Sequence, residues 1–261
     1  MKIIDCSASI GLDTVNRAIV NHENYPVYER VRQLASAQEM LEEMDYCGVE
    51  QTFVYHQSMY DVDPSYGNQR ILQEVQKAPQ RLKPTWAILP PITEKAFAPE
   101  TLFPAMRENG VCALRAYPLR NRYMLDAVSM GELLDAMVER AVPLYLSPQD
   151  GWEPVFGVLR EFPQLTVILT NYGLWGSARY FYPLVRAYKN VYIDTSDYQV
   201  VCGLRAFVDR YGADRLLFGS NLPMDGIGGP LAALFGAELR PEDREKIAHE
   251  NIERIMGGVK L

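Results

Sequence analysis

Short apolar runs alternate along this chain with stretches that place apolar residues on one helical face. The runs are bounded by turn residues, which is typical of buried strands. They occupy residues 3–9, 52–55, 84–89, 111–116, 143–146, 166–170, 191–195 and 216–218. The clearest helix begins with a capping-box spacing at Ser36 and Glu39 and stops at Gly48. Because each run is followed by a helical stripe, we predict parallel pairing and closure into a (β/α)8 TIM barrel.

Polar residues stand at the ends of the first and last predicted strands. Ser7 and Ser9 share one face because strand side chains alternate, and Cys6 is expected on the opposite face. The last apolar run ends at Gly219, and Asn221 follows it in a predicted loop. Since the carboxyl ends of all strands in a parallel barrel face one mouth, we expect both ends of the chain to meet at one pocket.

The composition predicts one globular domain over residues 1–261. The chain is 48% hydrophobic with 17 Pro and 18 Gly, and the long loop 11–35 after the first strand is predicted to be a functional lid. The net charge is −7 and the basic residues are scattered, which argues against nucleic-acid and membrane partners. With no signal-peptide pattern, no bilayer-length apolar run and no CxxC pair, we expect a cytoplasmic protein.

Several segments together resemble one known family. They read IIDCSASIG at 3–11, GVCALRAYP at 110–118, EFPQLTVILTNYG at 161–173, NVYIDTS at 190–196 and GADRLLFGSNLP at 212–223. In this order, and over nearly the whole chain, they resemble the amidohydrolase-2 group of metal-dependent hydrolases. The resemblance implies a TIM barrel, often assembled as a homodimer. It also implies a divalent metal, held by His and Asp side chains at the strand ends, that activates water or polarises the substrate.

The sequence departs from that family at the positions of the metal ligands. Ser7 and Ser9 stand where the first strand would carry two histidines, Ser147 and Asn171 where the fifth and sixth strands would each carry one, and Asn221 replaces the aspartate of the eighth strand. Hydroxyl and amide oxygens are poor zinc ligands. We therefore predict no metal and no other cofactor, and a neutral pocket in which these side chains bind a small-molecule substrate through hydrogen bonds.

His56 is the candidate general base. It ends the second predicted strand on the face of Thr52 and Val54, and the prediction is that this face points into the mouth. A neutral imidazole near pH 7 can accept a proton from water. A structural, hydrogen-bonded histidine at a strand end is the alternative.

Charged residues at two other strand ends complete the candidate catalytic set. Arg115 ends the fourth predicted strand, and its guanidinium suits bidentate capture of a substrate carboxylate. Asp194 and Asp197 flank the end of the seventh, where either can orient a base or pair with Arg115. A purely structural ion pair is the alternative for these residues.

Aromatic residues follow the same strand ends. Tyr117 lies just beyond Arg115, and Trp152, Tyr172 and Trp175 follow the fifth and sixth predicted strands. They are expected to form the wall of a pocket for an apolar or aromatic ligand, with helix packing as the alternative.

These observations lead to two hypotheses about function. In the first, the protein is a metal-independent hydrolase of an ester or lactone with a carboxylated substrate, as the resemblance permits, since the family includes lactonases that work without metal. His56 would deprotonate water, and Ser7, Ser147, Asn171 and Asn221 would stabilise the oxyanion. In the second, the barrel has lost its chemistry and binds a small molecule without consuming it.

Overall fold

The computed structural model describes residues 1–11, 34–173, 178–198 and 200–261. Most of the long loop predicted at 11–35 falls on residues 12–33 and therefore lies outside the described residues. The strands are β1 Ile4–Ile10, β2 Gln51–His56, β3 Leu82–Pro84, β4 Trp86–Ala87, β5 Leu114–Ala116, β6 Leu144–Leu146, β7 Val167–Leu169, β8 Val191–Asp194 and β9 Leu216–Leu217.

All of these strands pair in parallel and form a barrel. One sheet has the order β1-β2-β3 and the other runs from β4 to β9 in chain order. The third predicted strand is divided at Thr85, where β3 ends on one sheet and β4 begins the other. The seam between β9 and β1 is closed by backbone hydrogen bonds from Cys6 to Phe218 and from Ser9 to Leu222, both 2.8 Å long. The fold is thus the predicted (β/α)8 barrel.

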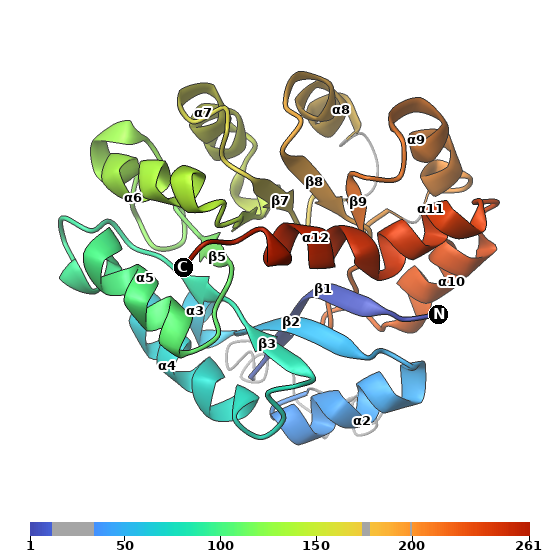
Figure 1. The fold of residues 1–261 in the computed structure, drawn as a ribbon, viewed down its shortest axis with the longest axis horizontal. Coiled ribbons are helices and arrows are strands. Elements are labelled where there is room, and N and C mark those ends of the chain that lie inside the picture. The colour runs from blue at the N-terminus through green and yellow to red at the C-terminus, as the bar shows by residue number, and fades with distance from the viewer. Residues whose placement is uncertain (12–33, 174–177, 199) are drawn as a thin grey trace, which may run out of the picture.

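Helices surround the strands (Figure 1). They are α2 Ala37–Cys47, α3 Ser58–Asp61, α4 Pro64–Val75, α5 Pro99–Glu108, α6 Ala127–Arg140, α7 Glu153–Glu161, α8 Ala178–Ala187, α9 Gly203–Tyr211, α10 Gly228–Gly236, α11 Pro241–Glu245 and α12 Asn251–Gly257, with 3-10 turns at Lys95–Phe97 and Pro148–Asp150 and a π-helical turn at Lys246–Glu250. The capping box predicted at Ser36 and Glu39 is present, and Gly48 ends α2 with φ 73°. None of the helices described is both long and apolar enough to cross a membrane.

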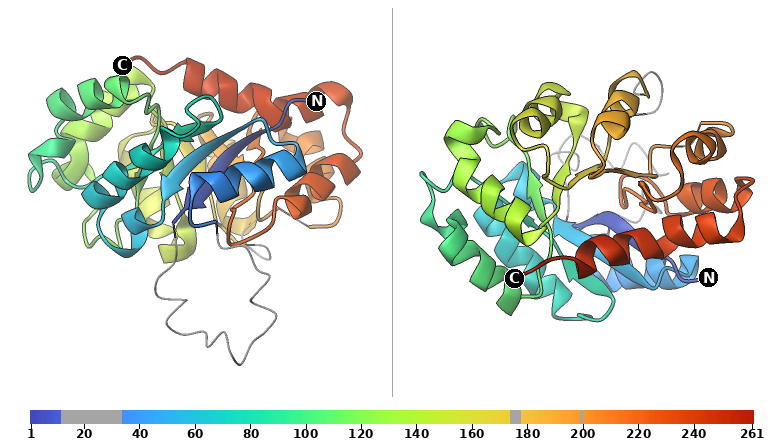
Figure 2. Two further views of the ribbon diagram at one scale, coloured as in Figure 1. Left: turned by 90° about the horizontal axis from the view of Figure 1, so that it is seen from below. Right: turned by 45° about the horizontal axis from the view of Figure 1, so that its top comes forward.

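The apolar core has two parts, which define an inside and an outside for each strand. The larger part lies between the strands and the helices. The smaller part fills the barrel and joins Ile4, Phe53 and Tyr145 to Ile252 and Ile255 of α12. Figure 2 shows α12 and both chain termini at one end of the barrel. Because α12 covers the amino ends of the strands, the opposite end carries the mouth.

Candidate active site

A cavity of about 700 Å³ opens among the loops that follow the carboxyl ends of the strands. Of the residues predicted for the site, it is lined by Tyr117, Ser147, Asn171, Tyr172, Asp197 and Asn221. These residues come from loops after β5, β6, β7, β8 and β9, so the barrel brings together side chains that lie about a hundred positions apart in the chain. Sequence reasoning missed the remaining lining, which consists of Tyr55, Gln57, Tyr60, Asp61, Pro148, Gln149, Gly173, Met224 and Asp225.

Arg115 lies inside the barrel and is not among the residues that line the cavity. Its side chain is buried, and its guanidinium carbon is 4.1 Å from the ring centre of Tyr55 and 4.2 Å from that of Tyr145. Its Nε donates to Thr85 Oγ1 at 2.7 Å and its Nη2 donates to Ser7 Oγ at 3.1 Å. Two rings and two hydroxyls therefore hold this cation in one place, where it makes cation–π contacts on both sides.

The two serines of β1 also lie outside the cavity lining. Ser7 is buried, and its hydroxyl accepts a hydrogen bond from the Arg115 guanidinium. Ser9 is also buried, and its backbone N–H donates a hydrogen bond to the Leu222 carbonyl. The expectation that Cys6 faces away from Ser7 is wrong, because Cys6 belongs to the apolar cluster inside the barrel. The pairing of β1 with β2 shifts register between Asp5 and Ala8, and such an irregularity breaks the alternation of side chains.

The predicted orientation of His56 is also wrong. On β2 it is Phe53 that belongs to the interior cluster and Tyr55 that lines the cavity, whereas Val54 packs on the outside. His56 shares the outer face: its Nδ1 accepts the backbone N–H of Ser58 at 3.2 Å. A Cβ on Gly11, whose φ is 104°, would lie 2.7 Å from its ring. Burial lowers the pKa of His56. This geometry matches the alternative, a structural histidine at the end of a strand.

Two buried carboxylates lie beneath the cavity. Asp5 accepts the backbone N–H groups of Ser7 and Ser220 at 3.1 Å each and also the Ser220 hydroxyl. Asp194 Oδ1 accepts the Ser196 N–H at 2.6 Å. Burial raises the pKa of Asp5 to about 6 and that of Asp194 to about 7. The Arg115 guanidinium opposes the rise at Asp5. Both carboxyl groups accept hydrogen bonds from the backbone, and their charge changes between about pH 6 and 7.

Gly219 makes room for one of these acids. A Cβ at this position would overlap the carboxylate of Asp194. The glycine that interrupts the last strand is therefore required by a close approach between β8 and the loop after β9.

Asp197 and Asp225 face the cavity from neighbouring loops. Asp197 Oδ2 accepts the backbone N–H of Gly173 at 2.9 Å, and Asp225 Oδ2 accepts Nδ2 of Asn221 at 2.7 Å. Burial raises the pKa of Asp197, and the nearby Asp225 carboxylate raises it further. The site thus contains a half-buried carboxylate whose proton affinity exceeds that of an exposed aspartate.

Two residues of the lining each carry a buried polar atom that makes no hydrogen bond of normal geometry to the described part of the chain. These atoms are the hydroxyl of Tyr117, whose side chain is 8% exposed, and Oδ1 of Asn171. Burial raises the pKa of Tyr117 well above its usual range, although the Arg115 guanidinium lies close enough to oppose this. Asn171 and Asn221 have φ of 50° and 57°, a left-handed conformation that asparagine tolerates better than most residues.

The aromatic residues divide between the cavity and helix packing. Tyr172 lines the cavity and donates its hydroxyl to the Asp194 carbonyl at 2.8 Å. Trp152 instead stacks on Tyr180 of α8, with ring centres 4.9 Å apart and planes 10° apart. Trp175 lies outside the described residues. Trp152 is thus placed as the helix-packing alternative predicts.

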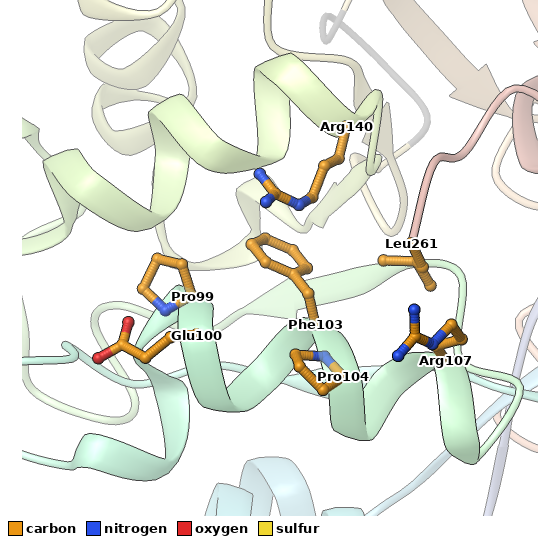
Figure 3. Close-up of a pocket in the computed structure, with 7 residues that line it drawn as sticks. All are labelled: Pro99, Glu100, Phe103, Pro104, Arg107, Arg140 and Leu261. Atoms are coloured by element: carbon orange, nitrogen blue, oxygen red, sulfur yellow. The ribbon is translucent and has the colours of Figure 1, made fainter.

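A second cavity, of about 410 Å³, lies on the outside of the barrel (Figure 3). Residues of α5, the end of α6 and Leu261 line it, and Arg140 extends over the ring of Phe103 at 4.7 Å from its guanidinium carbon. Because no strand end contributes to this cavity, it does not share the residues of the mouth.

The described residues contain no group of three or more His, Cys, Asp or Glu side chains placed to hold a metal ion. Ser147, Asn171 and Asn221 lie around the mouth and supply hydroxyl and amide groups. They form hydrogen-bonding surfaces rather than a set of charged ligands.

Comparison with known proteins identifies the family of the chain. The family model described as amidohydrolase matches residues 24–258. No curated protein sequence matches the chain. An uncharacterised TIM-barrel protein of Bordetella bronchiseptica superposes with a TM-score of 0.76 at 19% identity, covering 99% of both chains.

Two decarboxylases have a similar fold. The 2,6-dihydroxybenzoate decarboxylase from Rhizobium gives a TM-score of 0.75 at 18% identity, covering 98% of this chain and 99% of that one. The manganese-containing 5-carboxyvanillate decarboxylase of Novosphingobium aromaticivorans gives 0.71 at 14% identity, covering 98% and 96%. At these identities the similarity establishes the fold alone.

Proposed function

This chain belongs to the amidohydrolase family, and from that premise we propose that it hydrolyses a small ester or lactone in the mouth cavity without a metal ion. The observation that carries the proposal is that Asp197, a carboxylate with a raised pKa, and Tyr117, a residue with a phenolic hydroxyl, line the same cavity. A base and a hydrogen-bond donor in one pocket are the minimum that acyl transfer to water requires.

Asp197 is the proposed general base. A raised pKa makes a carboxylate a stronger base at neutral pH than an exposed aspartate, and the hydrogen bond from Gly173 fixes the orientation of the group. Asp197 takes a proton from water while the water oxygen bonds to the acyl carbon. The bond from that carbon to the leaving oxygen then breaks, and the proton passes to this oxygen. The products are a carboxylic acid and an alcohol, or one hydroxy acid from a lactone.

Tyr117 is the proposed donor to the oxyanion. The Arg115 guanidinium lies near its hydroxyl, which makes no hydrogen bond of normal geometry to the described residues, and because burial raises its pKa it stays protonated at neutral pH. Arg115, held between two tyrosine rings, adds a fixed positive charge near this hydroxyl. A preorganised donor supported by a cation stabilises negative charge that develops on the substrate.

The side chains inside the barrel beneath the cavity support a reaction without a metal ion. Ser7 occupies a position where the family resemblance implies a histidine ligand, and its oxygen accepts a hydrogen bond from Arg115. A divalent ion bound to Ser7 would lie next to a guanidinium and be repelled by it. The side chains at the other ligand positions that the resemblance implies, Ser9, Ser147, Asn171 and Asn221, offer hydroxyl and amide groups, which bind zinc poorly. These residues do not fit the metal, so no step of the proposed reaction passes through one.

Hydrolysis is favoured over decarboxylation by the charge of the lining. The cavity is lined by Asp61, Asp197 and Asp225, and by no Lys or Arg within the described ranges. A substrate carboxylate would find no cation there, because Arg115 is 3% exposed and its Nε and Nη2 are already bonded. We therefore propose a substrate without the carboxylate that the sequence led us to expect.

The proposal is tested with p-nitrophenyl esters and simple γ- and δ-lactones as substrates of the full chain. Asp197→Asn is expected to lower kcat/KM by about 100-fold or more, since general-base catalysis contributes roughly 100- to 10,000-fold. Asp209→Asn is the matched control, because Asp209 is an exposed aspartate paired with Arg205 on α9. Equal turnover by the two variants would contradict the proposal.

A second candidate function is binding without turnover. The outward orientation of His56 favours it, because the histidine that sequence reasoning selected as base does not line the cavity. In that case a ligand that raises the melting temperature stays chemically intact during long incubation, and Asp197→Asn changes affinity only.

A further inference from the structure

We propose that the mouth cavity selects a ligand that carries an organic ammonium group, held by Asp225 among tyrosine rings and leaving Asp197 free to act as the base. The inference rests on the proposed function, since it names the substrate class of the same site.

The negative charge in the mouth cavity is not balanced by cations of its lining. Asp61 has a cation nearby, the guanidinium of Arg120 at 3.5 Å. Asp197 and Asp225 make no ion pair with any Lys or Arg of the described ranges, and they are close enough for Asp225 to raise the pKa of Asp197. Their hydrogen-bond donors are neutral, the backbone N–H of Gly173 and the amide of Asn221. A positive ligand relieves this repulsion, and a negative ligand adds to it.

Hydrogen bonding around the cavity is also incomplete, independently of charge. Asn171 lines the cavity, and its Oδ1 is buried without a donor from the described residues. An amide oxygen can only accept, so the missing partner must bring an N–H or O–H group. Tyr117, more than nine-tenths buried in the same lining, also has a hydroxyl without a hydrogen bond of normal geometry to the described residues. An ammonium group brings three donors to a site that offers carboxylate and amide acceptors.

Aromatic rings form much of the cavity wall. Tyr55, Tyr60, Tyr117 and Tyr172 all line the cavity. Two of these rings already face cations of the protein, Tyr55 with Arg115 at 4.1 Å and Tyr60 with Arg120 at 4.9 Å. Tyrosine faces attract ammonium groups as they attract guanidinium groups, and the attraction is strongest where water is excluded. Ring faces that no guanidinium covers thus add to the preference for a cation that the carboxylates create.

The test compares three probes that share one ring and differ in charge: benzylammonium, benzyl alcohol and benzoate. Isothermal titration calorimetry with the full chain, at about pH 8 so that carboxylates are ionised, measures the affinity of each. We expect benzylammonium to bind at least about tenfold more tightly than benzyl alcohol, and benzoate to give no saturable binding up to ~10 mM. Asp225→Asn should remove the preference for benzylammonium, and Asp209→Asn should keep it.

Several results would overturn the inference. They are tighter binding of benzoate, equal binding of the alcohol and the ammonium, no saturable binding of benzylammonium up to ~10 mM, or a preference that survives in Asp225→Asn. The comparison of probes on the unmodified protein stands even where a variant fails to fold. Ester turnover that depends on Asp197 but shows no ammonium preference removes this inference alone. Ammonium binding without turnover removes only the proposed hydrolysis.

Discussion

The Arg115 guanidinium donates a hydrogen bond to the hydroxyl of Ser7, 3.1 Å away, inside the barrel. This contact joins β5 to β1, which lie 108 positions apart in the chain. It also puts a permanent cation beneath the mouth, between the rings of Tyr55 and Tyr145. Both the stability and the chemistry of the protein should therefore depend on Arg115.

Replacing Arg115 should destabilise the fold. Arg115→Met leaves Thr85 and Ser7 without a donor and removes the charge that offsets Asp5, so we expect the free energy of unfolding to fall by about 3 kcal/mol. Urea unfolding measures this. Arg205→Met, which removes an exposed arginine paired with Asp209, should cost less than about 1 kcal/mol. Similar losses in the two variants would show that the buried contacts of Arg115 carry no special weight.

Stability should fall as the pH rises from 4 to 8. Asp194 binds its proton more tightly in the folded protein, where burial raises its pKa to about 7, than in the unfolded chain. Its stabilising contribution is complete below about pH 4 and is lost as the pH rises through about 7. Asp5, with a pKa of about 6, acts in the same direction.

Asp194→Asn isolates this effect. Because the amide does not ionise, the free energy of unfolding of this variant should depend less on pH, by a few kcal/mol between about pH 4 and 8. Asp209→Asn should keep the profile of the unmodified protein. A pH profile of Asp194→Asn that runs parallel to that of the unmodified protein would mean that Asp194 does not titrate as its burial implies.

A methyl group at Gly219 should not be tolerated. Gly219→Ala places Cβ against the Asp194 carboxylate, so we expect a loss of about 2 kcal/mol or more in thermal or urea unfolding. Gly157→Ala is the matched control, because nothing lies within 4 Å of the added atom on α7. That substitution should be neutral or stabilising by up to about 1 kcal/mol, since alanine favours the helix. Equal effects would mean that Asp194 moves aside without cost.

The purified protein should contain little metal. Elemental analysis of the tag-free chain is expected to find less than about 0.1 zinc or manganese per chain, because hydroxyl and amide oxygens bind these ions weakly. Ser7→His/Ser9→His/Asn221→Asp should bind zinc better when combined with Arg115→Met than alone. Stoichiometric metal in the unmodified protein would remove the basis for metal-independent hydrolysis.

His56 should be dispensable for turnover. Its ring lies outside the cavity, so His56→Gln should leave kcat/KM within about threefold of the unmodified protein while lowering stability by about 1 kcal/mol, the usual cost of a lost hydrogen bond. Asp197→Asn provides the contrast in the same assay. Loss of turnover in a folded His56→Gln would restore the histidine as the base.

The local pattern of residues was sufficient to predict the barrel. Alternation of buried strands and amphipathic helices depends on neighbours a few positions apart, and the capping box at Ser36 and Glu39 lies within one turn. Asp197, Asn171 and Tyr117 were also predictable, because residues just beyond parallel strands must reach the mouth.

Which face of each strand points inward was decided by the tertiary structure. Side chains alternate with a period of two, so an error of one position exchanges the inner and outer sets. That is why Tyr55 rather than His56 lines the cavity, and why the shifted register of β1 puts Cys6 inside. Burial of Arg115 depends on closure of the barrel, and the approach of Asp225 to Asp197 depends on the pairing of β8 with β9. The spacing of residues in the sequence does not predict these contacts, because they are set by the packing of separate elements of the fold.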